Sequence, residues 1–409
     1  MKVCVGDKTE RKEDKEQAAI AITRLLPTEV LYRVFHLLPP RDLKAVVLVC
    51  RWWREVGEAP ALWVWVCLKV KEESGAKVGE MLVSRRLQAV RRVELEEVEV
   101  SEKLVRAVGR HPGLRELEVD ADISTLDPQL LARTVLQLED VDFVLVTAQQ
   151  VTAICSLMTG DSRLRNLGLS CDHLSSVDAE VLARAVTQLE EVYFDKLTCH
   201  QVTAICTAMK ANCKLRKLNL SYTSLSLVEP DQLSQAVAQL AEVDLSFTDL
   251  TPPQAEALFG ALSTASQLKV LKISGSNLST VDPDMMASAV SKLIEANINN
   301  TQLSPQQVEA IFAALQAPSQ LRTLHLKSSN LSSVDPGVMA RVVNKLETVE
   351  MNLCHLTVAH LTEVLARALV ATSLQQLLVG GNDCGQEAQG VSQALIEQAK
   401  QAIQHIHIW

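Results

Sequence analysis

The chain has 409 residues and a formal net charge of −9, with 47% hydrophobic and 22% charged residues, a composition typical of a soluble globular protein. No apolar run reaches the about 18–20 residues that a membrane-spanning helix needs, and the charged opening residues do not resemble a signal peptide. The negative charge and the lack of a basic run interleaved with aromatic residues argue against nucleic-acid binding. We therefore expect a cytoplasmic or nuclear protein that contacts neither membrane nor nucleic acid.

Residues 23–68 differ in composition from the rest of the chain, because they contain four of its five tryptophans: Trp52, Trp53, Trp63 and Trp65. Apolar residues at helical spacing predict three short helices here. Pro27 is expected to begin the first helix, and Pro39 with the next proline to end it. Asp42 is placed to cap the second helix, and Pro60 precedes a last turn. A domain of this size buries only a small hydrophobic core, and we therefore expect it to be stable only when it packs against another part of the protein or a partner.

The same segment carries a specific set of motifs: Leu26-Pro27-x-Glu29-Val30-Leu31, Asp42-Leu43, Val49-Cys50-Arg51-x-Trp53 and Leu62-Trp63. In this order they resemble the F-box family. The resemblance implies docking onto the adaptor subunit of a Skp–cullin–F-box ubiquitin ligase. The alternative is a three-helix cap on the rest of the fold.

Helical spacing alone does not separate an interface from a small core, so these assignments are open to exchange. We expect an apolar adaptor-binding patch formed or supported by Leu26, Pro27, Val30, Leu31, Leu38 and Leu43. We expect the three helices to be held together by Phe35, Val46, Val49, Cys50, Trp53 and Trp63.

Two charged segments flank this domain. Residues 1–22 are dense in Lys, Glu, Asp and Arg, which is typical of a flexible tail. Residues 69–86 are charged and contain two glycines, which favours a connector, in part helical. The stiffness of that connector would set the distance between two binding surfaces.

A repeated pattern fills residues 87–385. Units such as the one at Leu268, LKVLKISGSNLSTVDPDMMASAVSKL, alternate with units such as the one at Leu240, giving a super-repeat of roughly fifty residues. Each unit opens with apolar residues at L-x-x-L-x-L spacing, which predicts a short strand whose alternate side chains point inward. About twelve strands are expected, opening at Val90, Leu114, Leu138, Leu164, Leu189, Leu215, Leu240, Leu268, Leu293, Leu321, Leu346 and Leu374.

An amphipathic helix is expected after each strand. In the first kind of unit, Asp282 can cap the helix and Pro283 can occupy its first position. In the second kind, Thr or Ser followed three residues later by Gln forms a capping-box pattern, at Thr147/Gln150, Thr198/Gln201, Thr251/Gln254 and Ser304/Gln307. The copy at Thr357 has His360 instead and departs from the pattern.

One unit cannot bury its own apolar stripe, but stacked units bury a continuous core. The predicted fold class is therefore an α/β solenoid, with parallel strands inside and helices outside, preceded by the small all-α domain. It resembles the leucine-rich-repeat family, of the ribonuclease-inhibitor-like horseshoe type. Leu218, Leu220, Leu271 and Ile273 should be buried in this core. Residues 386–409 are expected to form a C-terminal cap, made of a final helix and an extended tail.

The inner sheet face of the first five repeats is predicted to be acidic. Each repeat has three inward-facing strand positions, which gives fifteen in the first five repeats. Nine of these positions hold Asp or Glu and one holds Arg92, whereas the same positions in the later repeats hold a mixture of acidic, basic and neutral residues. Such a face attracts cations, so a Lys/Arg-rich segment of a protein substrate is a candidate ligand; the alternative is a solvated surface that keeps the sheet soluble. The candidate substrate-binding residues are Glu94, Glu96, Glu116, Glu118, Asp120, Asp140, Asp142, Glu191, Tyr193 and Asp195.

No catalytic, cofactor or metal site is predicted. His405 and His407 have no third ligand nearby in the sequence, and the same holds for Cys199, His200 and Cys206. No phosphate-binding glycine loop and no G-x-S-x-G motif occurs. Cys155 and Cys206 fill one position in two copies of VTAIC, which indicates buried free thiols in a reducing compartment.

The predicted function is that of a non-catalytic substrate-recognition subunit. By the F-box resemblance, the helical domain binds a Skp-type adaptor on a cullin scaffold, and the concave repeat face binds a protein substrate destined for ubiquitination and proteasomal degradation. The alternative is a leucine-rich-repeat interaction or inhibitor protein in which the F-box serves assembly. An enzyme with a site in the cleft is the third hypothesis, without a motif to support it.

Overall fold

The computed structural model describes residues 26–408 except 65, 172, 195, 210–212, 265, 371–372 and 383–390. The predicted tail at 1–22 and part of the predicted cap therefore lie outside the described residues. The chain divides into two units, Met1–Leu145 (unit 1) and Val146–Trp409 (unit 2). No described helix is long and apolar enough to cross a membrane.

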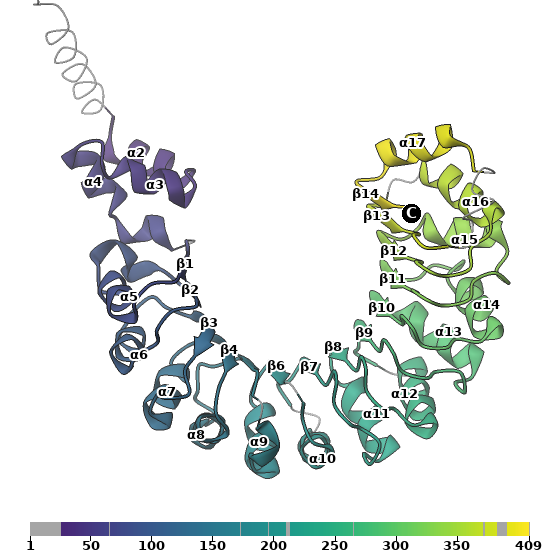
Figure 1. Cartoon of the computed structure of the whole chain (residues 1–409), viewed down its shortest axis with the longest axis horizontal. Helices are drawn as coiled ribbons and strands as arrows, with labels where there is room; N and C mark the ends of the chain where they lie inside the picture. The colour runs from purple at the N-terminus through teal and green to yellow at the C-terminus, as the bar shows by residue number, and fades with distance from the viewer. Residues whose placement is uncertain are drawn as a thin grey trace, which may run out of the picture. The chain divides into compact units, whose positions relative to one another are not determined.

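Unit 1 begins with the three predicted helices and a last turn, which are α2 (Thr28–His36), α3 (Pro40–Val46), α4 (Arg51–Gly57) and the 3₁₀ helix η1 (Pro60–Trp63) (Figure 1). The rings of Phe35 and Trp53 meet edge to face at 5.2 Å, and the Trp63 indole N–H donates to the Gly57 carbonyl at 2.8 Å. Cys50 caps α4, because its Sγ accepts from the Trp53 backbone N–H at 3.4 Å. These contacts join helices too short to be stable alone.

The prediction that Asp42 caps α3 is wrong. The helix begins at Pro40, so Asp42 lies in its first turn and the N-cap residue is Pro39, which makes no side-chain cap bond. An acidic side chain in the first turn still favours the helix, because it faces the positive end of the helix dipole.

The rest of unit 1 is a stack of repeats, with the elements β1 (Cys67–Lys71), α5 (Gly75–Leu82), η2 (Arg85–Ala89), β2 (Arg92–Glu96), α6 (Glu102–Gly109), β3 (Glu116–Asp122), α7 (Pro128–Val135) and β4 (Asp140–Leu145). The four strands pair in chain order and all pairs are parallel. Residues 69–86 therefore differ from the connector expected there. They complete a repeat, because Leu68 and Val70 are buried and β1 pairs with β2 along its whole length.

Unit 2 continues the same pattern of strand and helix, with the elements α8 (Ala148–Leu157), β5 (Asn166–Leu169), η3 (Leu174–Ser176), α9 (Ala179–Val186), β6 (Glu191–Phe194), α10 (Cys199–Ala208), β7 (Lys217–Asn219), α11 (Pro230–Ala238), β8 (Glu242–Asp244), α12 (Pro252–Thr264), β9 (Val270–Lys272), α13 (Pro283–Lys292), β10 (Glu295–Asn297), α14 (Pro305–Ala314), β11 (Thr323–His325), α15 (Pro336–Val343), β12 (Thr348–Glu350), α16 (Val358–Ala368), β13 (Gln376–Leu378), α17 (Gln393–Ala402) and β14 (His405–His407). Strands β5 to β14 pair in order and in parallel.

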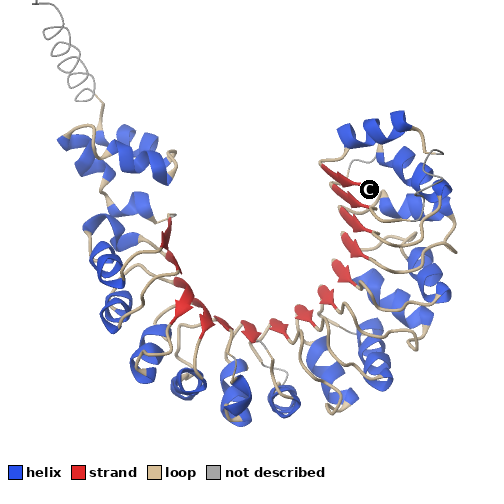
Figure 2. Cartoon of the chain, viewed as in Figure 1, coloured by secondary structure: helices blue, strands red, loops and turns tan. Residues whose placement is uncertain are grey.

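Helices cover one face of the sheet in each unit, and the other face is left open (Figure 2). We call the second face the open face. The predicted solenoid is confirmed, and each predicted strand opening is followed by a strand. The described residues add β1 before these strands, and the expected final helix and tail are α17 and β14. Leu218, Leu220, Leu271 and Ile273 are at most 3% exposed, as predicted.

The helix caps follow the sequence pattern. Asp127, Asp178, Asp282 and Asp335 each accept a backbone N–H in the first helical turn. In the second kind of unit, the buried Gln side chain also donates to the preceding unit; Gln307 Nε2 lies 2.7 Å from the Leu278 carbonyl and 2.6 Å from that of Val281. The cap thus joins successive repeats as well as starting a helix.

His360 was expected to depart from this pattern, but the structure contradicts that expectation. Its Nδ1 accepts the Thr357 backbone N–H at 3.2 Å, and its Nε2 lies 2.7 Å from the Val334 carbonyl. An imidazole protonated on Nε2 presents one acceptor and one donor, as the Gln amide does. The side chain is 3% exposed and serves the same role.

Candidate functional site

The first helix of the small domain carries an exposed apolar stripe. Leu26, Val30, Val34 and Leu37 recur at helical spacing, and they are 39%, 41%, 48% and 84% exposed. Pro27 is also exposed. The opposite face of α2 is buried through Leu31 and Phe35. Because water contact with apolar side chains is unfavourable, such a stripe indicates a surface for a protein partner.

Several residues exchange places relative to the sequence prediction. Leu31 and Leu43, expected to form or support the adaptor patch, are 2% exposed and lie in the core of the small domain. Leu38 is half-buried. Val49, expected in the core, is 58% exposed, so that prediction is wrong. Val34 and Leu37 were not predicted to belong to this surface, although they follow Val30 by four and seven residues, a spacing that places side chains on one side of a helix.

The other predicted core residues of the small domain lie inward. Phe35, Val46 and Trp63 are buried, and Cys50 and Trp53 are half-buried. Trp65 lies outside the described residues.

The open face of unit 1 holds seven of the predicted acidic residues, which we call the acidic cluster: Glu94, Glu96, Glu116, Glu118, Asp120, Asp140 and Asp142. Parallel pairing puts Glu116 beside Asp140 and Glu118 beside Asp142. Like charges placed side by side in this way repel one another.

Basic side chains on β1 and β2 offset part of this repulsion. Arg92 lies 2.8 Å from Glu94, 3.3 Å from Glu116 and 3.1 Å from Glu118. Lys69 contacts Glu94 at 2.5 Å, and Lys71 contacts Glu96 at 2.8 Å. Neither lysine was predicted to face the cluster, because residues 69–86 were expected to be a connector and not to contain part of a strand. The seven carboxylates of the acidic cluster outnumber these three basic side chains.

Glu94 is the most perturbed carboxyl of the cluster. Hydrogen bonding from Lys69, with contributions from Cys67 and Arg92, lowers its pKa from 4.5 to about 2 although burial opposes the shift. Burial and the hydrogen bond to Glu94 raise the pKa of the Cys67 thiol to about 11. Glu94 is therefore anionic and Cys67 is a neutral thiol at neutral pH. Neither arrangement activates a nucleophile, which requires a lowered thiol pKa.

In unit 2, Glu191 and Glu242 of the open face are paired with lysines. Glu191 lies 2.8 Å from Lys217, and Glu242 lies 3.4 Å from Lys272. The hydrogen bond from Lys217 to Glu191 raises the pKa of that lysine. Tyr193, which follows Glu191 on β6, is 56% exposed, as an aromatic anchor would be. Asp195 lies outside the described residues.

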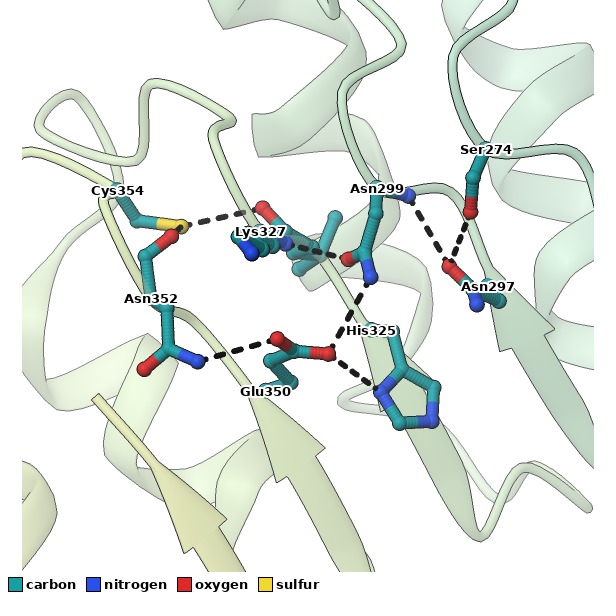
Figure 3. A network of polar contacts seen from close by, with 9 residues as sticks. Ser274, Asn297, Asn299, His325, Lys327, Glu350, Asn352 and Cys354 are labelled. Atoms are coloured by element: carbon teal, nitrogen blue, oxygen red, sulfur yellow. Dashed lines mark hydrogen bonds and ion pairs between the residues drawn. The ribbon is translucent and has the colours of Figure 1, made fainter. Parts of the chain in front are cut away.

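Farther along unit 2, the open face is a network of amides and hydroxyls centred on Glu350, which we call the Glu350 network (Figure 3). The carboxylate accepts from Asn299 at 3.2 Å and Asn352 at 3.1 Å and lies 3.0 Å from His325 Nδ1. Burial would raise the pKa of Glu350, but these hydrogen bonds outweigh it and lower the pKa.

The network extends across neighbouring strands. Ser274 Oγ donates to Asn297 Oδ1 at 2.7 Å, and Asn299 Oδ1 accepts the Lys327 backbone N–H at 2.6 Å. Side chains that are bonded to one another in this way keep a fixed arrangement on the sheet. The open face thus offers a rigid polar surface here and an ionic one in unit 1.

The remaining candidates for chemistry are not brought together. Among the described residues, no group of three or more His, Cys, Asp and Glu side chains is placed to hold a metal ion. His405 and His407 are exposed on the last strand. Cys155 and Cys206 are buried, which raises the pKa of each thiol to about 12, consistent with a packing role.

The F-box-like family model matches residues 23–69. Among curated protein sequences, none matches this chain. Several solved structures are similar in fold. A yeast complex of Rad7 and Elc1 contains a chain of 11% identity and TM-score 0.48, covering 93% of this chain and 94% of that one. An internalin (inlF) from Listeria monocytogenes has 15% identity and TM-score 0.45, covering 79% of this chain and 82% of that one. The TLR13–ssRNA13 complex contains a chain of 14% identity and TM-score 0.34, covering 72% and 57%.

Proposed function

This protein joins an F-box-like domain at residues 23–69 to leucine-rich repeats, and from that pairing we propose that it is the substrate-recognition subunit of a Skp–cullin–F-box ubiquitin ligase. The F-box-like domain binds the adaptor, and the open face of the repeats binds a protein substrate. Other subunits carry out the ubiquitin chemistry. The gain is proximity, because the bound target is held at high effective concentration near the charged ubiquitin carrier.

The exposed stripe on α2 is the observation that supports adaptor binding most directly. Val30 and Val34 lie on the exposed side of α2 and Leu26 and Leu37 flank the helix, while Leu31 and Phe35 of the same helix are buried. A domain this small has few apolar residues to spare, so leaving four of them in water disfavours folding unless a partner covers them.

The acidic cluster of unit 1 is the proposed contact for a Lys/Arg-rich segment of the substrate. Its seven carboxylates outnumber Lys69, Lys71 and Arg92, the basic side chains that pair with Glu94 and Glu96. Apart from Glu94, the side chains of these pairs are exposed, so a cationic segment can exchange with them at small cost. Such a contact accelerates association and weakens as salt rises.

Adaptor binding can be tested with the double substitution Val30→Asp and Val34→Asp in the full chain, which places two charges on the stripe. We expect recovery of a Skp-type adaptor in a pull-down to be lost, because a charge buried at an apolar interface without a partner is strongly unfavourable. Circular dichroism should show that the repeats remain folded.

The matched control is Val83→Asp, which changes an exposed valine, 67% accessible, outside the F-box-like domain. It should leave adaptor recovery unchanged. Undiminished recovery by the Val30/Val34 variant would contradict the proposed surface. Substitution of Leu31 is unsuitable, because that side chain is in the core and its loss disrupts the domain itself.

A second experiment separates the receptor function from assembly without degradation. The wild-type complex is purified and the bound target is assayed for ubiquitin transfer with the cullin present. Transfer that depends on both the α2 stripe and the repeats supports a receptor. Adaptor binding without any transfer to a bound target favours the interaction or inhibitor protein.

A further inference from the structure

A column of residues in unit 2 adopts the left-handed backbone conformation just after the strands. Its members, with φ between 56° and 78°, are Lys196, Tyr222, Phe247, Gly275, Asn300, Ser328, Leu353 and Gly381. The recurrence shows that the turn of the repeat requires this conformation. Gly and Asn accept it readily, whereas bulky side chains are disfavoured there.

Two successive positions of this column nevertheless hold aromatic residues. The rings of Tyr222 and Phe247 are stacked, with centroids 5.0 Å apart and planes 11° from parallel. They are 68% and 51% exposed. The next position is Gly275, where a Cβ would lie 2.7 Å from Phe247 Cδ1, so the missing side chain leaves room for the ring.

The backbone holds this aromatic pair in place. The Tyr222 N–H donates to the Ser246 carbonyl at 3.0 Å, and the Phe247 N–H donates to that of Ser274 at 2.6 Å. Asp249 accepts from Ser224 Oγ at 2.7 Å, which ties the turn after Tyr222 to the turn after Phe247. A rigid aromatic pair loses little conformational entropy on binding, as an interface anchor should.

Folding does not account for the two rings. The turn requires a positive φ, which Asn300 and Gly381 supply in other repeats, and exposed rings add little to the core. Tyr193 adds a third exposed ring on β6, whose partner strand β7 leads into Tyr222. Three exposed aromatic side chains on three consecutive repeats are characteristic of a binding surface.

The charges around these rings indicate the chemistry of the ligand. Lys217 is paired with Glu191 and Lys272 with Glu242, so neither the lysines nor the carboxylates of these two pairs carry an uncompensated charge for a charged segment to meet. Binding free energy can come mainly from removing the rings from water, and this favours a ligand with an apolar or aromatic side chain. This differs from the acidic cluster of unit 1, where charge complementarity favours a basic segment.

We infer that Tyr193, Tyr222 and Phe247 form a docking site for an uncharged, extended peptide segment of the substrate that carries an aromatic or proline side chain. The inference rests on the proposed receptor function and specifies a part of the substrate that the acidic cluster does not select. Aromatic rings stack well on aromatic and proline side chains.

The test uses the full chain as bait for a phage-displayed library of random peptides, without a known substrate. Selected peptides are made synthetically and their affinities measured by fluorescence polarisation. We expect sequences rich in aromatic residues or proline, without an excess of Lys and Arg. The double variant Tyr222→Ser/Phe247→Ser should weaken binding at least about tenfold, the effect of losing an aromatic anchor.

Leu353→Ser is the matched control, because Leu353 occupies the same backbone column, is 49% exposed, and precedes Gly381 as Phe247 precedes Gly275. It should leave the affinity unchanged. The inference is overturned if the peptides bind the double variant as well as the wild type, if they are basic and depend on the acidic cluster, or if no selected peptide depends on the rings. Adaptor recovery, measured separately, reports on the proposed function and is unaffected by any of these outcomes.

Discussion

The open faces of the two units share one backbone plan but use different chemistry. In unit 1, Arg92 and the lysines of β1 pair with exposed carboxylates across parallel strands. In the later repeats of unit 2, Glu350 is half-buried and held by amide and imidazole groups. Exposed ion pairs act over distance and are screened by salt, whereas hydrogen-bond networks act only at contact.

This contrast separates two tasks. A face with net charge attracts a ligand from solution, and a fixed polar face fits one once it has arrived. One solenoid chain can carry both a charged face and a fixed polar face, because the side chains of the open face do not enter the core. The substitutions below test how far the core, the caps and the two faces act independently.

The largest effect is expected in the shared core. Leu271 is fully buried behind the open face of unit 2, so Leu271→Ala should lower the free energy of unfolding by about 2–5 kcal/mol through the cavity it leaves. Urea denaturation measures this loss. Val83→Ala, at an exposed site, should change stability by less than about 0.5 kcal/mol. If Leu271→Ala lowered the free energy of unfolding by as little as Val83→Ala, the assignment of Leu271 to a core position of the repeat would be contradicted.

The next effect is expected at the unusual cap. His360→Ala should destabilise unit 2 by about 1–3 kcal/mol, because the buried Val334 carbonyl loses its donor and Thr357 loses its acceptor. His360→Gln should recover most of that stability, since Gln makes both bonds in the other copies. Equal losses in the two variants would show that imidazole packing, rather than hydrogen bonding, matters here.

A smaller effect is expected on binding kinetics. Reversing Glu116, Glu118, Asp140 and Asp142 to Lys should slow association with a Lys/Arg-rich substrate segment about tenfold at low salt, and less at high salt. Stopped-flow kinetics would measure the rate. The control reverses four exposed helix residues and changes the net charge equally: Glu256, Glu309, Glu363 and Glu397. Association of the cluster variant at the wild-type rate would leave the cluster as a solvated surface.

The smallest effect is expected for the ion pairs of a single carboxylate of unit 1, Glu94. The pKa of Glu94 is lowered from 4.5, the ordinary value that applies to the unfolded chain, to about 2 in the folded protein. The folded state therefore favours the ionised carboxylate. The resulting stability is fully present above pH 4.5 and is lost as the pH falls toward 2. Glu94→Gln should flatten this part of the stability profile, by about 1 kcal/mol or less since its partners are exposed.

Thermal unfolding between pH 2 and 5 at low salt measures that profile. Glu80→Gln on α5 is the control, because its side chain is exposed on the helix layer. A wild-type profile that is already flat over this range would show that the ion pairs of Glu94 do not contribute to stability.

The sequence by itself determined the repeat architecture. Strand openings, Asp caps and capping boxes depend on residues within a few positions of one another, so a one-dimensional pattern contains them. The F-box motifs were found for the same reason, as fixed residues at short spacing. Cys155 and Cys206 were placed correctly in the core because the repeat assigns both to one helical position.

Tertiary structure decided what depends on distant partners. Lys69 lies opposite Glu94 only because β1 pairs with β2. The lysines of β1 alternate with Leu68 and Val70, and the burial of these two residues was not predicted from so charged a segment. Val30 and Leu31 are adjacent in the sequence, but Val30 is exposed and Leu31 is buried. Which of the two is buried depends on the side of α2 against which the other helices pack. The stack of Tyr222 on Phe247 likewise joins two repeats, and no local pattern contains a contact between residues so far apart in the chain.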